Sequence, residues 1–212
     1  MPMTRKPALT SALLFLCLAI TFPAMAVEEA EYTVIKTDGA IELRDYEPSI
    51  VAETLVQGDF EDASSKAFRT LFRYIDGENE ARDKIAMTAP VSQKQGSQKI
   101  AMTAPVSQEA SKGGWLVSFM MPSSFTMDTI PVPLDDDVKI RQIPAYRAAA
   151  IRYSGFWSEK NYERHLAELE RWMKSQNLQA AGPAVWARYN APFTPWFMRR
   201  NEILVPVIST SP

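Results

Sequence analysis

The sequence predicts an α+β domain built as a twofold β-α-β-β pseudo-repeat, with an antiparallel sheet or open, distorted barrel and two main helices on one face. The first observation is that residues 41–58 and 138–155 align when the chain is shifted by 97 positions. Each segment opens with an alternating strand pattern, passes a proline, continues as a second extended run and ends at a glycine. The second observation is that a helical pattern follows each glycine, with further strand-like runs after each helix.

Each predicted helix has an N-cap residue and one apolar stripe. Asp59 precedes the first helix, whose stripe recurs at helical spacing, and Asp76-Gly77 stops it. Ser158 precedes the second helix. The first stripe consists of Phe60, Ala63, Ala67, Leu71 and Ile75, and the second of Tyr162, Leu166, Leu169 and Met173.

Two strands are expected after each helix. In the first half they are the KIAMTAPV segment and residues 115–121, and in the second half residues 183–189 and 202–207. Residues 123–137, with two prolines and an acidic run, connect the halves. Two such halves leave a groove between them, where a small ligand is expected to bind.

A tandem repeat stands inside the first half. The ten residues KIAMTAPVSQ occur at 84–93 and again at 99–108. Alternation of Ile85 and Met87 with smaller side chains is typical of a strand, and Pro90 and Pro105 place each copy at a sheet edge or at the end of a strand. Which copy occupies the strand of the fold is left open by the sequence.

Residues 1–26 have the pattern of a secretory signal. Arg5 and Lys6 precede an apolar run of residues 9–20, and Ala24-Met25-Ala26 forms a cleavage site. We therefore expect a periplasmic or secreted protein whose residues 27–212 form one domain, with the internal repeat at about 32–122 and 138–207. This mature part contains no cysteine and no transmembrane segment, and its 21 basic against 25 acidic residues make nucleic acid an improbable partner. We expect a monomer.

Three motifs resemble the SOUL heme-binding protein family. They are KIAMTAPV, VSFMMPSSF at 117–125 and ARYNAPFTPWFMRRNEILVPV at 187–207, and the resemblance covers about residues 32–207. It implies the twofold β-α-β-β fold that the family shares with gyrase-inhibitor-like small-molecule-binding domains. It also implies that heme or another tetrapyrrole binds in a shallow apolar groove and is buffered or carried without catalysis.

A heme site needs apolar area for the macrocycle and cations for the propionates. The first helix offers two phenylalanines and two arginines at i, i+4 spacing, and a proline-rich loop offers aromatic residues followed by two arginines. The candidate ligand-binding residues are Phe68, Arg69, Phe72, Arg73, Phe193, Trp196, Arg199 and Arg200. The alternatives are ordinary core for the phenylalanines, solvated helix surface for Arg69 and Arg73, and structural contacts for Arg199 and Arg200.

Protein ligation of a heme iron and catalysis have little support in the sequence. His165, the single histidine, falls at the edge of the second apolar stripe, which is typical of a packed boundary residue, so we expect no strong axial ligation and no metal site. No catalytic motif is present, and we expect a protein that is not an enzyme. The alternative is a binder, or a hydrolase, that recognises another apolar or cationic small molecule with Glu53 or Glu202, whose pKa would be raised in an apolar groove. An interaction module with a filled groove also remains open.

Overall fold

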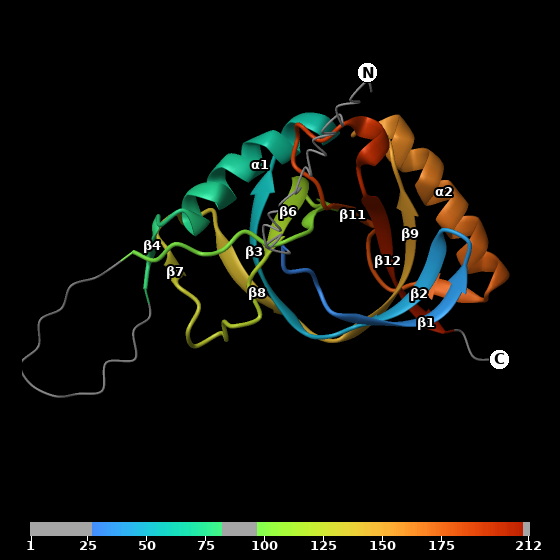
Figure 1. Ribbon diagram of the computed structural model, residues 1–212, viewed down its shortest axis with the longest axis horizontal. Coiled ribbons are helices and arrows are strands. Elements are labelled where there is room, and N and C mark those ends of the chain that lie inside the picture. The colour runs from blue at the N-terminus through green and yellow to red at the C-terminus, as the bar shows by residue number, and fades with distance from the viewer. Residues whose placement is uncertain (1–26, 82–96, 210–212) are drawn as a thin grey trace, which may run out of the picture.

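A computed structural model describes residues 27–81 and 97–209 (Figure 1). Within these ranges the main sheet has ten strands in the order β1-β2-β9-β12-β11-β5-β6-β3-β8, with β10 paired to β12, and its strand pairs are antiparallel. A separate two-stranded sheet joins β4 (Asn79–Glu80) to β7 (Val132–Pro133). The strands of the main sheet are β1 (Tyr32–Asp38), β2 (Ile41–Tyr46), β3 (Ser49–Val56), β5 (Val106–Ser111), β6 (Gly114–Met120), β8 (Lys139–Ile143), β9 (Tyr146–Tyr153), β10 (Leu178–Ala180), β11 (Val185–Arg188) and β12 (Asn201–Ser209).

The strand order has a twofold pseudo-symmetry about the central β11–β5 pair. On one side of this pair lie β12, β9 and β2, and on the other side the corresponding strands β6, β3 and β8. The first strand of each half therefore pairs with the other half: β2 with β9, and β8 with β3. β3 and β9 begin and end 97 residues apart, the offset at which the two sequence segments align. The sheet is curved but not closed, so the predicted α+β architecture is confirmed, whereas the internal repeat in the sequence stays a prediction.

Two helices cover one face of the sheet. α1 (Phe60–Ile75) packs on β3 and β6, and α2 (Glu159–Ser175) packs on β9 and β12 (Figure 1). The predicted stripe of α1 is buried at all five positions, whereas in α2 Leu169 and Met173 are buried and Tyr162 and Leu166 are half-buried. Neither helix is long and apolar enough to cross a membrane, and this holds for every helix in the described ranges.

The helix starts differ in how they are capped. Ser158 Oγ accepts a hydrogen bond from the backbone N–H of Asn161, as expected of an N-cap serine. Asp59 holds the N-cap position of α1 with extended backbone, but its side chain makes no capping hydrogen bond. The position was therefore predicted correctly, and the side-chain contact was not.

The second copy of the KIAMTAPV motif does not form the strand that its pattern predicts. The first copy, at 84–93, lies outside the described residues. In the second copy residues 99–103 form no strand, and β5 begins only at Val106, after Pro105. The segment instead joins α1 to β5: the N–H of Ile100 donates to the carbonyl of Ile75, and Thr103 Oγ1 donates to the carbonyl of Met120. Since proline cannot donate to a ladder, the strand starts beyond it.

The other expected strands agree closely with the structure. Residues 115–121 correspond to β6, residues 183–189 to β11 and residues 202–207 to β12. The edge strand β1 was not predicted. It follows a stretch of charged residues, and most of its side chains are exposed, so it lacks the apolar alternation that identifies a buried strand.

Candidate functional site

A cavity of about 420 Å³ lies where the two halves meet. α1 contributes Ser64, Ser65 and Phe68, and the central strands β5 and β11 contribute the floor. The cavity is thus bounded by both halves, as expected for a groove at their junction. Its remaining lining residues are Val106, Trp157, Trp186, Arg188, Asn190 and Pro192.

The floor of the cavity is held rigidly. Trp186 is buried on β11, and its ring stacks on Phe60 of α1 at a centroid distance of 4.7 Å. The buried amide of Gln108 ties β5 to the same helix, because its Nε2 donates to the carbonyl of Phe60 and its Oε1 accepts from Ser64 Oγ. On the helix wall the ring of Phe68 packs edge-on against Phe119 at 5.3 Å. A site on such interlocked elements keeps its shape without a ligand.

Arg188 places a positive charge in this cavity. The Cζ atom of its guanidinium lies 4.7 Å from the centroid of the Trp186 ring and 5.3 Å from that of Trp157. Its side chain is partly exposed as a whole, yet Nε is enclosed and has no hydrogen-bond acceptor. Burial lowers the pKa of Arg188 to about 10, so the guanidinium remains a cation at neutral pH.

Trp157 connects the cavity to the loop that follows β11. Its Nε1 donates to Asn201 Oδ1 at 2.8 Å, which fixes the indole against β12. The guanidinium of Arg199 lies 4.2 Å from the centroid of the same ring. Arg199 also donates to the carbonyls of Thr194 and Pro192, at 2.8 Å in each case, and so shapes the loop.

The eight residues predicted for the site do not all lie together. Phe68 lines the cavity, and Arg199 contacts its wall through Trp157. Phe72 stacks on Phe68 at 5.9 Å but is 40% exposed. Arg69 is exposed, and Arg73 pairs with Glu78 and Asp135 at the far end of the helix.

The predicted loop residues lie beyond the cavity lining or on the other side of the sheet. Phe193 is 89% exposed, and Trp196, at the start of the 3₁₀ helix Trp196–Met198, stacks on Phe156 at 5.2 Å. Arg200 pairs with Glu202 and Glu29 on the sheet face away from the helices, so it lies outside the cavity. Sequence reasoning missed Trp157, Trp186 and Arg188; the alternation of Trp186 and Arg188 along one strand was the available signal.

The face of the sheet away from the helices carries a buried ion network. Glu202 is completely buried and accepts hydrogen bonds from Arg44 Nη1 at 2.7 Å, from Arg200 Nε at 3.0 Å and from Tyr189 Oη at 3.0 Å. Burial alone would raise the pKa of Glu202, but Arg44 and Arg200 outweigh it, and the pKa lies below its ordinary value. The expectation of a raised pKa is therefore wrong for Glu202. Glu53 is paired as well, at 2.7 Å from Arg141 Nη2.

His165 is not among the residues that line the cavity. Its ring stacks on Tyr153 at 4.1 Å, and Nδ1 lies 3.5 Å from the carboxylate of Glu168. Burial lowers the pKa of His165, which keeps the imidazole neutral near pH 7. Within residues 27–81 and 97–209, no group of three His, Cys, Asp or Glu side chains is arranged to hold a metal ion.

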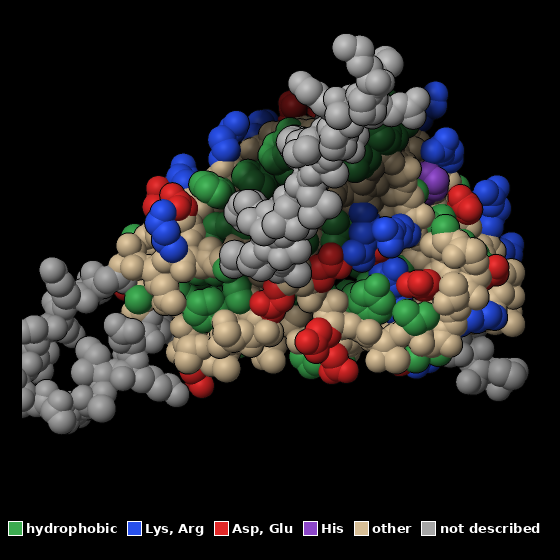
Figure 2. Space-filling model, in the orientation of Figure 1, with side chains coloured by type: hydrophobic (Ala, Val, Ile, Leu, Met, Phe, Trp, Pro, Cys, Tyr) green, Lys and Arg blue, Asp and Glu red, His purple; other side chains and the backbone are tan. Residues whose placement is uncertain are grey.

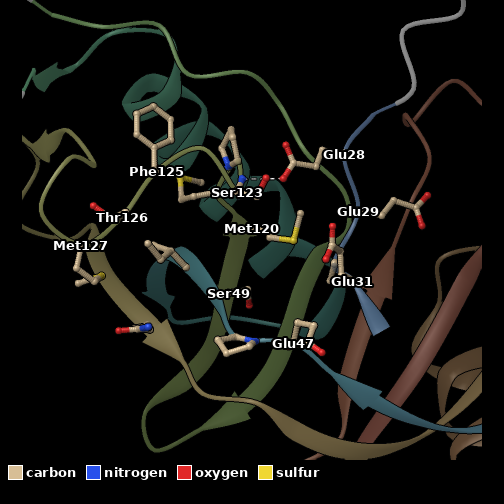
Figure 3. Close-up of a pocket in the computed structure, with 16 residues that line it drawn as sticks. Glu28, Glu29, Glu31, Glu47, Ser49, Met120, Ser123, Phe125, Thr126 and Met127 are labelled. Atoms are coloured by element: carbon tan, nitrogen blue, oxygen red, sulfur yellow. Dashed lines mark hydrogen bonds between the residues drawn. The ribbon is translucent and has the colours of Figure 1, made fainter. Parts of the chain in front are cut away.

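A second hollow, of about 410 Å³, has an acidic rim (Figure 3). Glutamates at positions 28, 29, 31 and 47 lie on one side of it, and Phe125 and Met127 lie on the other. Glu28 already accepts from the backbone N–H of Ser123 at 2.6 Å, and Glu29 pairs with Arg200. On the face shown in Figure 2, Lys and Arg side chains follow the outer surfaces of both helices, and Asp and Glu side chains gather lower, in the middle of the view.

Comparison with known proteins gives a consistent picture. Curated relatives include "Heme-binding protein 1" of Xenopus tropicalis, 27% identical over 165 residues, and "Heme-binding protein 2" of Homo sapiens, 28% identical over 175 residues. Each alignment covers 77% of this chain, and 82% and 80% of the respective relative.

Solved structures show the fold. The C-terminal domain of EcmrR has a TM-score of 0.56 over 84% of this chain and 98% of that domain, and a structure titled as a hydrolase from Listeria innocua has a TM-score of 0.51 over 82% and 94%. Both are only 12% identical to this chain, so they support the architecture alone. The family model described as SOUL heme-binding protein matches residues 27–206, which include both halves of the sheet and the cavity between them. This chain therefore belongs to the SOUL heme-binding protein family.

Proposed function

We propose that this protein binds heme or a related tetrapyrrole in the cavity above β5 and β11. The observation that carries the proposal is an aromatic-walled, largely apolar cavity in a member of a family whose relatives are named heme-binding proteins. The cavity contains a guanidinium that has no carboxylate partner among the described residues. Its volume of about 420 Å³ falls in the range of small-molecule sites, about 300–1,000 Å³.

The macrocycle is expected to pack on the ring of Phe68 and on the indoles of the cavity. Aromatic side chains bury large apolar areas and favour offset stacking, which suits a flat conjugated ligand. Arg199, beside Trp157 at the loop, and Arg188, in the cavity, are the cations in position to meet propionates. Arg200 is not among the cations proposed to meet propionates, because it is already paired with the carboxylates of Glu29 and Glu202.

The absence of strong iron ligation is part of this proposal. The described residues that line the cavity include no histidine, cysteine, methionine or tyrosine, the side chains that serve as axial ligands. We therefore propose that packing and charge pairing hold the ligand, which suits buffering or transport rather than chemistry on the iron.

We also propose that the protein works outside the cytoplasm, after cleavage following Ala26. The support is the signal pattern of residues 1–26 together with a family match that begins at residue 27. Expression of the full chain in a Gram-negative host, followed by N-terminal sequencing of the envelope fraction, is expected to give Val27 as the first residue. Recovery of an uncleaved cytoplasmic chain would contradict export.

The binding proposal is tested by titrating hemin into residues 27–212 and following the Soret band. We expect saturable one-to-one binding, unchanged by His165→Ala. Phe68→Ala is expected to weaken it by about 1.5–3 kcal/mol, or roughly 10- to 150-fold, because the apolar area of one aromatic ring is lost.

Phe125→Ala is the matched control. Like Phe68, Phe125 is partly buried against the core under α1, but it lines the acidic hollow instead of the cavity. We expect this variant to bind hemin normally. Loss of binding in Phe125→Ala alone would move the site to the acidic hollow, and absence of saturable binding to hemin and to metal-free porphyrin would refute a tetrapyrrole ligand.

A further inference from the structure

Arg188 differs from the other arginines that are buried or half-buried. Arg44 pairs with Glu202 and Glu42, Arg200 pairs with Glu202 and Glu29, and Arg199 donates to the carbonyls of Thr194 and Pro192. Arg188 makes no ion pair and no hydrogen bond with any residue that the structure describes. Because a buried charge without a partner is costly, an exception of this kind requires an explanation.

The surroundings of Arg188 are rich in donors and poor in acceptors. Trp186 Nε1 and Tyr153 Oη are also buried near one another, and neither has a well-formed hydrogen bond to a described residue. Arg188 lies opposite Asn201 in the sheet, and Asn201 lies opposite Tyr153, so these side chains occupy one row on the helix face. Arginine and tryptophan side chains can only donate. Because Arg188 also carries a positive charge, the patch is complementary to an anion whose oxygens accept hydrogen bonds.

We propose that Arg188 makes this cavity select apolar ligands that carry a carboxylate, an inference that rests on the proposed function. The carboxylate enters first and binds between the indoles of Trp157 and Trp186. The class includes propionate-bearing tetrapyrroles and extends to other apolar monocarboxylates, such as long-chain fatty acids. A planar guanidinium matches a carboxylate through two parallel hydrogen bonds, and a monoanion loses less hydration on entering an apolar cavity than a dianionic phosphate does.

The indole rings prepare Arg188 for this role. Contact with two aromatic faces holds the guanidinium in place before the ligand arrives, so little side-chain freedom is lost on binding. Trp157 is itself fixed by Asn201, and Trp186 by its stacking on Phe60. The rigid frame thus holds the cation in place, and no described residue serves as its counter-ion.

The test compares dodecanoate with dodecan-1-ol at pH 8, with quenching of tryptophan fluorescence as the signal. The two probes share an alkyl chain and differ in charge. Wild-type protein is expected to bind dodecanoate roughly 10- to 100-fold more tightly, the range for hydrogen bonds to a charged group. Arg188→Met is expected to remove this preference. Arg188→Lys is expected to keep part of it, since a lysine retains the charge but cannot make the two parallel hydrogen bonds of a guanidinium.

Arg152→Met is the matched control, because Arg152 is an exposed arginine on β9 that faces away from the cavity, and it is expected to leave the preference unchanged. The urea midpoint is a second readout: Arg188→Met is expected to raise it without ligand, since a buried unpaired cation is replaced by an apolar side chain. Equal selectivity in wild type and Arg188→Met, or a lowered midpoint with selectivity intact, would overturn the proposal and make Arg188 a structural residue.

Hemin and its dimethyl ester separate this proposal from the proposed function. If hemin binds wild type and Arg188→Met equally and the ester binds as well as hemin, tetrapyrrole binding stands and carboxylate selection by Arg188 fails. If hemin does not bind but dodecanoate binds in an Arg188-dependent manner, carboxylate selection stands and the tetrapyrrole ligand fails.

Discussion

Replacing Glu202 with glutamine tests whether this buried carboxylate is structural. The substitution preserves the shape of the side chain but removes the charge that Arg44 and Arg200 share. The two arginines donate to different carboxylate oxygens, Arg44 Nη1 to Oε2 at 2.7 Å and Arg200 Nε to Oε1 at 3.0 Å. Whichever oxygen the amide NH₂ group of glutamine replaces, one of these arginines would be left with a donor opposite a donor.

The expected cost follows from the remaining contacts. Breaking a buried ion pair costs about 3–5 kcal/mol of unfolding free energy. Arg44 retains Glu42 at 2.7 Å, and Arg200 retains Glu29 at 2.7 Å, so we expect the lower end, about 3 kcal/mol. For a domain of this size, about 2–4 °C per kcal/mol gives a fall in melting temperature of roughly 6–12 °C.

Urea unfolding followed by tryptophan fluorescence measures this change, with a check that the denaturant slope stays constant. Glu42→Gln is the matched control, since Glu42 binds the same arginine but its side chain is 27% exposed, and its loss is expected to cost at most about 1 kcal/mol. If Glu202→Gln costs no more than Glu42→Gln, the arginines do not depend on the Glu202 charge. If stability is retained but binding of a cationic ligand is lost, Glu202 is a recognition group and the structural interpretation is refuted.

Three further predictions concern stability. The pKa of Glu202 is lowered from 4.5, so its contribution is present above that pH and is lost as pH falls through the folded-state value; acid titration of stability is expected to be shallower in Glu202→Gln. Gly114→Ala is expected to destabilise the protein more than Gly113→Ala in urea unfolding, because both glycines have positive φ but only at Gly114 would a Cβ lie 2.3 Å from the carbonyl oxygen of Val56; equal effects would contradict this contact. Leu71→Ala, in the core under α1, is expected to cost about 2–5 kcal/mol, whereas Leu55→Ala, at a half-exposed site, should cost under about 1 kcal/mol in the same assay.

Much of the fold was predictable because it depends on near neighbours in the chain. Helical spacing identified α1 and its buried stripe, and alternation identified β6, β11 and β12. The same local reasoning failed at KIAMTAPV, where residues 99–103 alternate like a strand but find their partners in Ile75 and Met120 instead of in a ladder. A periodic pattern shows which residues are extended, and it does not show whether a strand lies beside them.

The site was less accessible to sequence reasoning, because its residues come from distant segments. Phe68 could be predicted from its helix, but the floor formed by Trp186 and Arg188 depends on the pairing of β11 with β5. Arg199 and Arg200 are adjacent in sequence, yet one contacts Trp157 and the other the Glu202 network on the opposite face of the sheet. Alternation predicts that neighbours in a strand point to opposite faces but not which face holds the cavity.

The sequence by itself determined the α+β class, the two helices with their buried stripes and the family to which the chain belongs. The tertiary structure alone decided which charges are paired. Arg44 on β2 meets Glu202 on β12 across 158 residues of sequence, because both strands pair with β9. Arg188 meets no carboxylate of the described residues, because the row that it shares with Asn201 and Tyr153 contains none. Whether a guanidinium is neutralised depends on distances of a few ångströms between strands, and strand pairing sets those distances.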